Sequence, residues 1–114
     1  MATKAQIVKR ALIRAGVIPY DREPTAEESQ QVTATLESIH AKWVDEDRVR
    51  WELTDIPQEI EDPLVSILAY SIADDFGVPD SRYSRLAATI QSAMQKIYAY
   101  DAEEYTGKSS ARYY

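Results

Sequence analysis

The sequence predicts an all-α protein: an antiparallel four-helix bundle-like domain with one short extended segment and an extended C-terminal arm. Three observations lead to this fold class. Apolar residues recur at helical spacing in four stretches of the chain. Capping pairs, prolines and glycines mark where these stretches begin and end. The chain has 114 residues and only 3 glycines, which suits one helical domain better than a β-rich fold. We place the helical domain at 1–104 and the arm at 105–114.

The first helix is expected from about Lys4 to Ala15. Thr3 and Gln6 have the spacing of a capping box, in which each side chain satisfies a backbone N–H of the other residue. Gly16 supplies the stop. The apolar stripe of this helix consists of Ile7, Val8, Ala11, Leu12 and Ala15. Its other side carries the bases Lys4, Lys9, Arg10 and Arg14.

The second helix is expected from Thr25 to about Glu46, after a connection that contains two prolines. Thr25 and Glu28 repeat the capping-box spacing, and acids in the first turn suit the helix dipole. About twenty residues make this helix roughly 30 Å long. Its apolar face consists of Val32, Leu36, Ile39, Trp43 and Val44.

The segment 47–57 breaks the helical pattern. Val49, Trp51 and Leu53 alternate with charged residues, which predicts a short extended strand. One short strand cannot form a sheet alone, so it must lie along helices or pair with another chain. Arg50 and Trp51 are therefore candidate protein-binding residues. The alternative for Trp51 is packing over its own bundle.

The third helix opens at Asp62-Pro63, an N-cap followed by proline at the first helical position, and stops at Gly77. The fourth starts at Asp80 or Ser81 and is expected to end near 103–104. About four residues join the two helices, so they should form an antiparallel hairpin. Their apolar positions are Leu64, Ile67, Leu68, Ile72 and Phe76, and then Leu86, Ala87, Ile90, Met94, Ile97 and Tyr98.

The C-terminal arm differs in charge from the rest of the chain. The net charge is −6, yet residues 105–114 hold two bases and no acid, which leaves −8 on the other residues. An acidic body disfavours general phosphate binding, whereas a basic arm suggests a partner of its own. Tyrosine and arginine are enriched at protein interfaces. The candidate protein-binding residues of the arm are Tyr105, Lys108, Arg112, Tyr113 and Tyr114. The alternative is a solvated, disordered terminus.

Residues for catalysis are scarce. The chain has no cysteine and one histidine, His40, which we interpret as a boundary residue beside Trp43. Its carboxylates cluster near predicted helix ends or on outward faces, either as a solvated acidic surface or as partners for a basic protein. No phosphate loop, nucleophile elbow or zinc motif is present. We therefore expect no enzyme activity and no catalytic, cofactor-binding or metal residues.

Membrane segments are not expected either. The longest apolar runs are only a few residues, too short to span a bilayer. The N-terminal Met1-Ala2-Thr3-Lys4 lacks the apolar stretch of a signal peptide. We expect the chain to be made and kept in a cytoplasm.

Several residues resemble the head–tail connector proteins of tailed bacteriophages (also called adaptor, head-completion or tail accessory factor proteins). The stretch Val8–Val17 looks like the opening helix of that family, which ends in a glycine followed by an apolar residue. Leu36-Glu37, then Trp43, then Asp47 before an extended stretch, look like its second helix and exit.

The resemblance implies a ring of identical subunits, usually twelve, beneath the portal at one capsid vertex. Such a ring extends the DNA channel, helps to retain packaged DNA and offers a platform for tail or nozzle proteins. The arm from Tyr105 to Tyr114 would reach along the portal. An acidic channel would let double-stranded DNA pass without sequence-specific binding. The expected location is the virion, at the head–tail junction, after assembly in the host cytoplasm. Two alternatives stay open, a small helical adaptor or regulator that forms no ring and a cell-wall hydrolase.

Overall fold

A computed structural model describes the backbone of residues 2–113 and the side chains as far as Tyr100. The element order is α1 (Lys4–Arg14), α2 (Ala26–Asp45), the 3-10 turn η1 (Gln58–Ile60), α3 (Glu61–Ala73) and α4 (Asp80–Tyr113). Within 2–113 there is no β-strand, only an isolated antiparallel bridge between Ala2 and Ile56. The predicted all-α class with four helices is confirmed.

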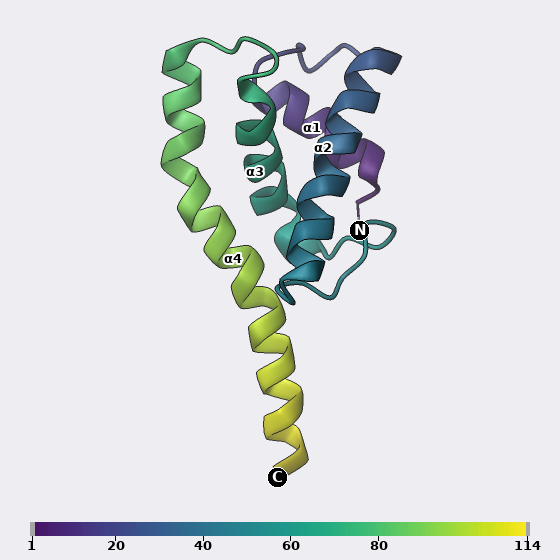
Figure 1. Ribbon diagram of the computed structural model, residues 1–114, viewed down its shortest axis with the longest axis vertical. Coiled ribbons are helices and arrows are strands. Elements are labelled where there is room, and N and C mark those ends of the chain that lie inside the picture. Colours follow the sequence, from purple (N-terminus) through teal and green to yellow (C-terminus); the bar gives the residue numbers. More distant parts are fainter. Residues whose placement is uncertain (1, 114) are drawn as a thin grey trace.

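Helix α3 is the centre of the fold. It packs against α1, α2 and α4, and Figure 1 shows it between α4 on one side and α2 on the other. Nine of its 13 residues are buried, so this helix is apolar on nearly every side. The helices α3 and α4 run antiparallel, as the short connection between them predicts. None of the helices, as far as the structure describes them, is long and apolar enough to cross a membrane.

Local capping sets the starts of the first two helices. Both predicted capping boxes form: Thr3 with Gln6 on α1, and Thr25 with Glu28 on α2. Gly16 follows α1 with φ +80°, the left-handed conformation that suits a glycine after a helix. The third helix differs slightly from the prediction. It begins at Glu61, directly after η1, so Pro63 lies inside its first turn.

The segment 47–57 is a loop, so the predicted strand is wrong as backbone structure. Within 2–113 no strand lies beside it, and its only β-type pairing is the bridge at Ile56; its other backbone hydrogen bonds are turn-like or reach α2, such as that from the Arg48 N–H to the Trp43 carbonyl. The predicted alternation nevertheless describes the side chains, because Val49 and Trp51 are buried whereas Arg48, Arg50 and Glu52 are exposed. The loop lies along the helices of its own chain.

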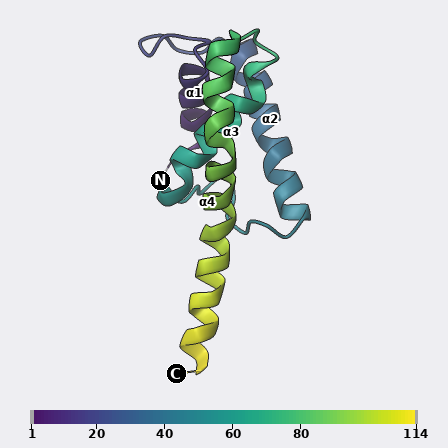
Figure 2. The same cartoon turned by 90° about the vertical axis from the view of Figure 1, so that its left-hand side faces the viewer.

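The fourth helix is longer than expected. It continues to Tyr113, so the backbone of 105–113 is helical rather than an extended arm, and the boundary proposed at 104 falls within α4. The sequence 80–113 contains no proline, and its one glycine, Gly107, costs only about 1 kcal/mol relative to alanine in a helix. Both views show the second half of α4 projecting from the body of the molecule (Figures 1 and 2).

Candidate functional site

The basic side of α1 is neutralised by acids from other parts of the chain. Five ion pairs do this: Lys4 with Glu37 (3.1 Å), Lys9 with Glu23, Arg10 with Glu61 (3.2 Å) and with Asp62 (3.8 Å), and Arg14 with Asp62 (2.6 Å). A phosphate-binding surface needs clustered positive charge that is available to the ligand. The bases of α1 therefore hold helices together and do not form such a surface.

A cluster of four aromatic rings joins the loop to α2 and α4. We define this aromatic cluster as His40, Trp43, Trp51 and Tyr98. The Trp51 ring centroid lies 5.0 Å from that of His40 and 6.4 Å from that of Trp43, and Trp43 lies 6.3 Å from Tyr98. The guanidinium of Arg48 covers the Tyr98 ring at 4.5 Å, a cation–π contact. The cluster fixes the loop on the body of the protein.

His40 lies beside Trp43 and holds the loop backbone. Its Nε2 lies 2.7 Å from the carbonyl oxygen of Trp51. A carbonyl only accepts, so Nε2 carries the proton and donates. This contact gives His40 a structural role between α2 and the loop, as the sequence predicted for a boundary residue.

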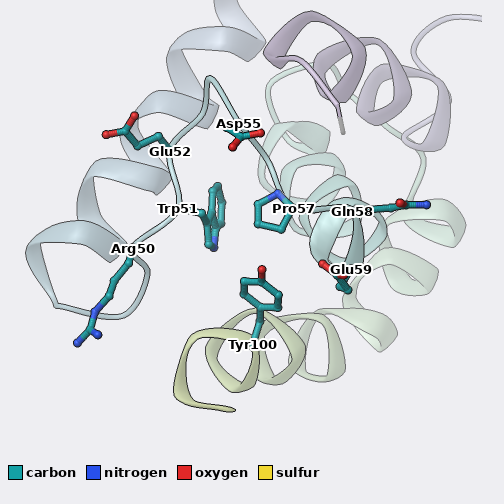
Figure 3. Close-up of a pocket in the computed structure, with 8 residues that line it drawn as sticks. All are labelled: Arg50, Trp51, Glu52, Asp55, Pro57, Gln58, Glu59 and Tyr100. Atoms are coloured by element: carbon teal, nitrogen blue, oxygen red, sulfur yellow. The ribbon is translucent and has the colours of Figure 1, made fainter. Parts of the chain in front are cut away.

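A cleft of about 610 Å³ lies on the other side of Trp51, and we call it the Trp51 cleft. The residues that line it are Arg50, Trp51, Glu52, Asp55, Pro57, Gln58, Glu59 and Tyr100. Figure 3 shows the indole nitrogen of Trp51 and the hydroxyl of Tyr100 pointing into the same space, with the Pro57 ring beside them. The cleft thus combines two polar groups, the Trp51 indole N–H and the Tyr100 hydroxyl, with the apolar ring faces of Pro57 and Tyr100.

One hydrogen-bond donor in this cleft has no partner. Trp51 is only 7% exposed, and its Nε1–H makes no hydrogen bond. Buried indole N–H groups usually find an acceptor, because an unsatisfied donor away from water is costly. The orientation of this donor makes the cleft the strongest candidate binding site in the described part of the chain.

Of the seven predicted protein-binding residues, the structure describes the side chains of two, Arg50 and Trp51. The structure brings Arg50 and Trp51 together at the cleft, but Trp51 is buried in its own chain and offers only its indole edge. The side chains of Tyr105, Lys108, Arg112, Tyr113 and Tyr114 lie outside the described residues. Sequence reasoning did not predict that Pro57, Glu59 and Tyr100 line the Trp51 cleft.

The two flanks of the molecule differ in charge. Helix α2 carries four acids and one base, and two of these acids, Glu28 and Glu37, pair with Arg22 and Lys4. The whole of α4 carries five bases and four acids, and its 80–100 part carries three of the bases and one of the acids. The residues involved are Glu27, Glu28, Glu37, Asp45 and Lys42 on α2, and Arg82, Arg85, Lys96 and Asp80 on α4. Since α3 lies between these helices, α2 and α4 lie on opposite sides of it (Figure 1).

A tyrosine pair links α3 to α4. The Tyr83 hydroxyl donates to the Tyr70 hydroxyl at 3.1 Å, and the ring centroids are 5.1 Å apart. This hydrogen bond and the charge of Tyr70 raise the pKa of Tyr83 above its usual value. No group of three or more His, Cys, Asp or Glu side chains among the described residues is placed to hold a metal ion.

Comparison of the chain with protein-family models, with curated proteins and with solved structures finds no match.

Proposed function

We propose that the chain is a non-enzymatic structural subunit of a tailed-phage head–tail connector, which forms a ring beneath the portal. The observation that most supports this is the shape of α4, one helix that begins in the body and projects beyond it (Figure 1). A compact body with a projecting basic arm suits a subunit that holds two neighbours at once. The resemblance of Val8–Val17 and of the second helix to connector proteins points the same way.

The opposite charges of the two flanks support ring assembly. Contacts around a ring are heterologous, so two different faces of each subunit must fit together. The acidic α2 and the basic 80–100 part of α4 lie on opposite sides of α3 and suit this requirement, because electrostatic complementarity favours contact between them and disfavours contact between like charges.

The charge balance also suits a DNA conduit. The chain carries −6, and the bases of α1 are paired with acids. A ring of such subunits attracts phosphates weakly, so double-stranded DNA passes through without sequence-specific binding. In this proposal the ring extends the channel, retains packaged DNA and carries tail or nozzle proteins at the head–tail junction of the virion.

Purified virions test the proposal. Electron microscopy and cross-linking should find the chain in many copies under the portal. Absence of the chain from mature particles would refute the proposal. Reversing one charge of the α4 flank with Arg85→Glu should reduce the number of copies that load on the portal. Lys42→Glu is the matched control, because it changes charge by the same amount but makes the acidic flank more acidic. Equal loading by both variants would remove the flanks from the interface.

The arm is tested separately. Deletion of residues 105–114 should abolish attachment to the portal, because it removes Lys108 and Arg112 together with three tyrosines. The helical circular dichroism of the body should persist, since its core residues all precede this segment. Unchanged attachment would show that the portal contact lies elsewhere.

A second candidate function is a small helical adaptor that binds another protein without forming a ring. The Trp51 cleft, with its unpartnered donor, is the observation that favours it. Mass measurement in the presence of the portal separates the two functions, because only the connector loads in many copies.

A further inference from the structure

The unpartnered Nε1–H of Trp51 points to a ligand that supplies an acceptor. The aromatic cluster holds the Trp51 indole in place, and His40 holds the Trp51 backbone by its hydrogen bond to the Trp51 carbonyl. The indole therefore cannot turn to find another partner. Its donor edge meets the cleft (Figure 3). A molecule in the cleft can therefore satisfy a donor that the fold leaves unsatisfied.

The charges around the cleft select the rest of the ligand. Three acids and one base line it: Glu52, Asp55, Glu59 and Arg50. In Figure 3 the Glu59 side chain lies on the same side of the cleft as the Tyr100 hydroxyl, whereas the side chains of Arg50 and Glu52 both point away from Trp51. The space in front of the indole is thus negative, which disfavours phosphates and carboxylates and favours a cation. The rings of Pro57 and Tyr100 offer apolar faces on which an aliphatic stem can pack.

We propose that the Trp51 cleft binds an extended peptide segment of a partner protein that carries arginine or lysine. A backbone carbonyl of the peptide accepts the hydrogen bond from Trp51 Nε1. The basic side chain next to that carbonyl pairs with Glu59 and lies against Pro57. A volume of about 610 Å³ is within the range of known ligand sites and holds a few peptide residues.

This inference goes beyond the connector function and does not require a ring. Binding to the cleft is a property of the isolated chain. Loss of the chain from virions would refute the connector and leave the cleft untouched, and an inert cleft would leave the connector untouched.

Nuclear magnetic resonance of the full-length ¹⁵N-labelled chain tests the proposal directly. The chain has two tryptophans, so its spectrum contains two indole N–H signals, and the signal that Trp51→Phe removes belongs to Trp51. The probes are capped pentapeptides with four alanines and a central arginine, lysine, glutamine or glutamate. The arginine and lysine peptides should move the Trp51 signal downfield and leave that of Trp43 in place. The glutamate peptide should move neither signal.

Two variants with the same charge change sharpen the result. Glu59→Gln should weaken binding of the arginine peptide several-fold, because it removes the carboxylate that faces the basic side chain. Glu37→Gln on α2 is the matched control and should leave the affinity unchanged.

Defined outcomes overturn the proposal. It fails if the arginine and lysine peptides leave the Trp51 signal unmoved, or if the glutamate peptide or inorganic phosphate moves it equally well. Equal affinity of Glu59→Gln and Glu37→Gln would also refute the assigned pairing. A decapeptide with the sequence of residues 105–114 extends the series. Tighter binding of this decapeptide than of the arginine pentapeptide would support the proposal and identify the partner as a second copy of this chain.

Discussion

Arg14 attaches α1 to α3 through three hydrogen bonds, and its replacement by methionine gives a prediction with a defined magnitude. The guanidinium donates to Ser66 Oγ at 2.7 Å, to the Asp62 backbone carbonyl at 3.1 Å and to Asp62 Oδ1 at 2.6 Å. Methionine keeps the apolar stem and removes all three hydrogen bonds. The variant thus separates the polar contacts from the packing of the stem.

The three lost contacts differ in their contribution. The Asp62 side chain is 70% exposed, so its ion pair stabilises by at most about 1 kcal/mol. Ser66 is 9% exposed, and a buried hydroxyl that loses its partner costs about 1–3 kcal/mol. We therefore expect Arg14→Met to lower the free energy of unfolding by about 1–3 kcal/mol, a large part of the stability of a small domain.

Urea unfolding followed by far-UV circular dichroism measures this loss. In a Ser66→Ala background the hydroxyl is absent, so Arg14→Met should cost clearly less there than in the natural chain, with a coupling energy of about 1 kcal/mol. The reasoning is refuted if Arg14→Met costs the same in both backgrounds. That result would mean that the Ser66 hydroxyl turns to a carbonyl of α3 and stays satisfied.

Four further predictions concern backbone conformation and pH. Gly77→Ala should cost about 1 kcal/mol, because φ is +65° and the space around it is open. Gly16→Ala should cost more, because its Cβ would lie 2.7 Å from Arg82 Nε, and thermal unfolding should show that this excess vanishes in an Arg82→Ala background. The Thr25 backbone N–H and Arg22 lower the pKa of Glu28 below its ordinary value of 4.5. The ionised Glu28 therefore stabilises the fold above pH 4.5, and this stabilisation is lost as pH falls through the lower pKa of the folded state. Glu28→Gln should flatten the dependence of the unfolding free energy on pH in that range. The pKa of Tyr83 is raised above 10.0, so the neutral Tyr83 stabilises the fold below pH 10.0, and this stabilisation is lost as pH rises through the pKa of the folded state. Tyr70→Phe should lower the pKa of Tyr83. An unchanged midpoint in a ¹³C titration of Tyr83 would contradict the role of the hydroxyl pair.

The features that sequence reasoning predicted well are those decided within a few residues. The capping boxes at Thr3 and Thr25 each need a partner side chain three positions further along the chain, so the spacing of the two residues alone predicts the capping box. The alternation around Trp51 correctly separated buried from exposed side chains, although the backbone is a loop. Helical periodicity gave the core positions of α1 for the same local reason, but on α3 it gave only four of the nine buried residues, because this helix is buried on nearly every side.

The features that it missed depend on the ends of elements and on distant partners. The stop near 103–104 was predicted because the sequence after it shows no helical periodicity, yet nothing in that sequence breaks a helix, and α4 continues to Tyr113. The cleft needs Tyr100 beside Trp51, and these residues come from a helix and a loop far apart along the chain. No periodicity within one element can place such a pair.

The amino-acid sequence by itself determined the helical class, the starts of α1 and α2, and a chemistry without cysteine and with a single histidine. The tertiary structure alone decided that Arg14 meets Asp62, 48 residues away, and that the indole N–H of Trp51 faces an acidic cleft without a partner. The physical reason is the range of the interactions. Caps and helical periods act over three or four neighbouring residues, whereas ion pairs between helices and the walls of a cleft exist only once the core around α3 has packed.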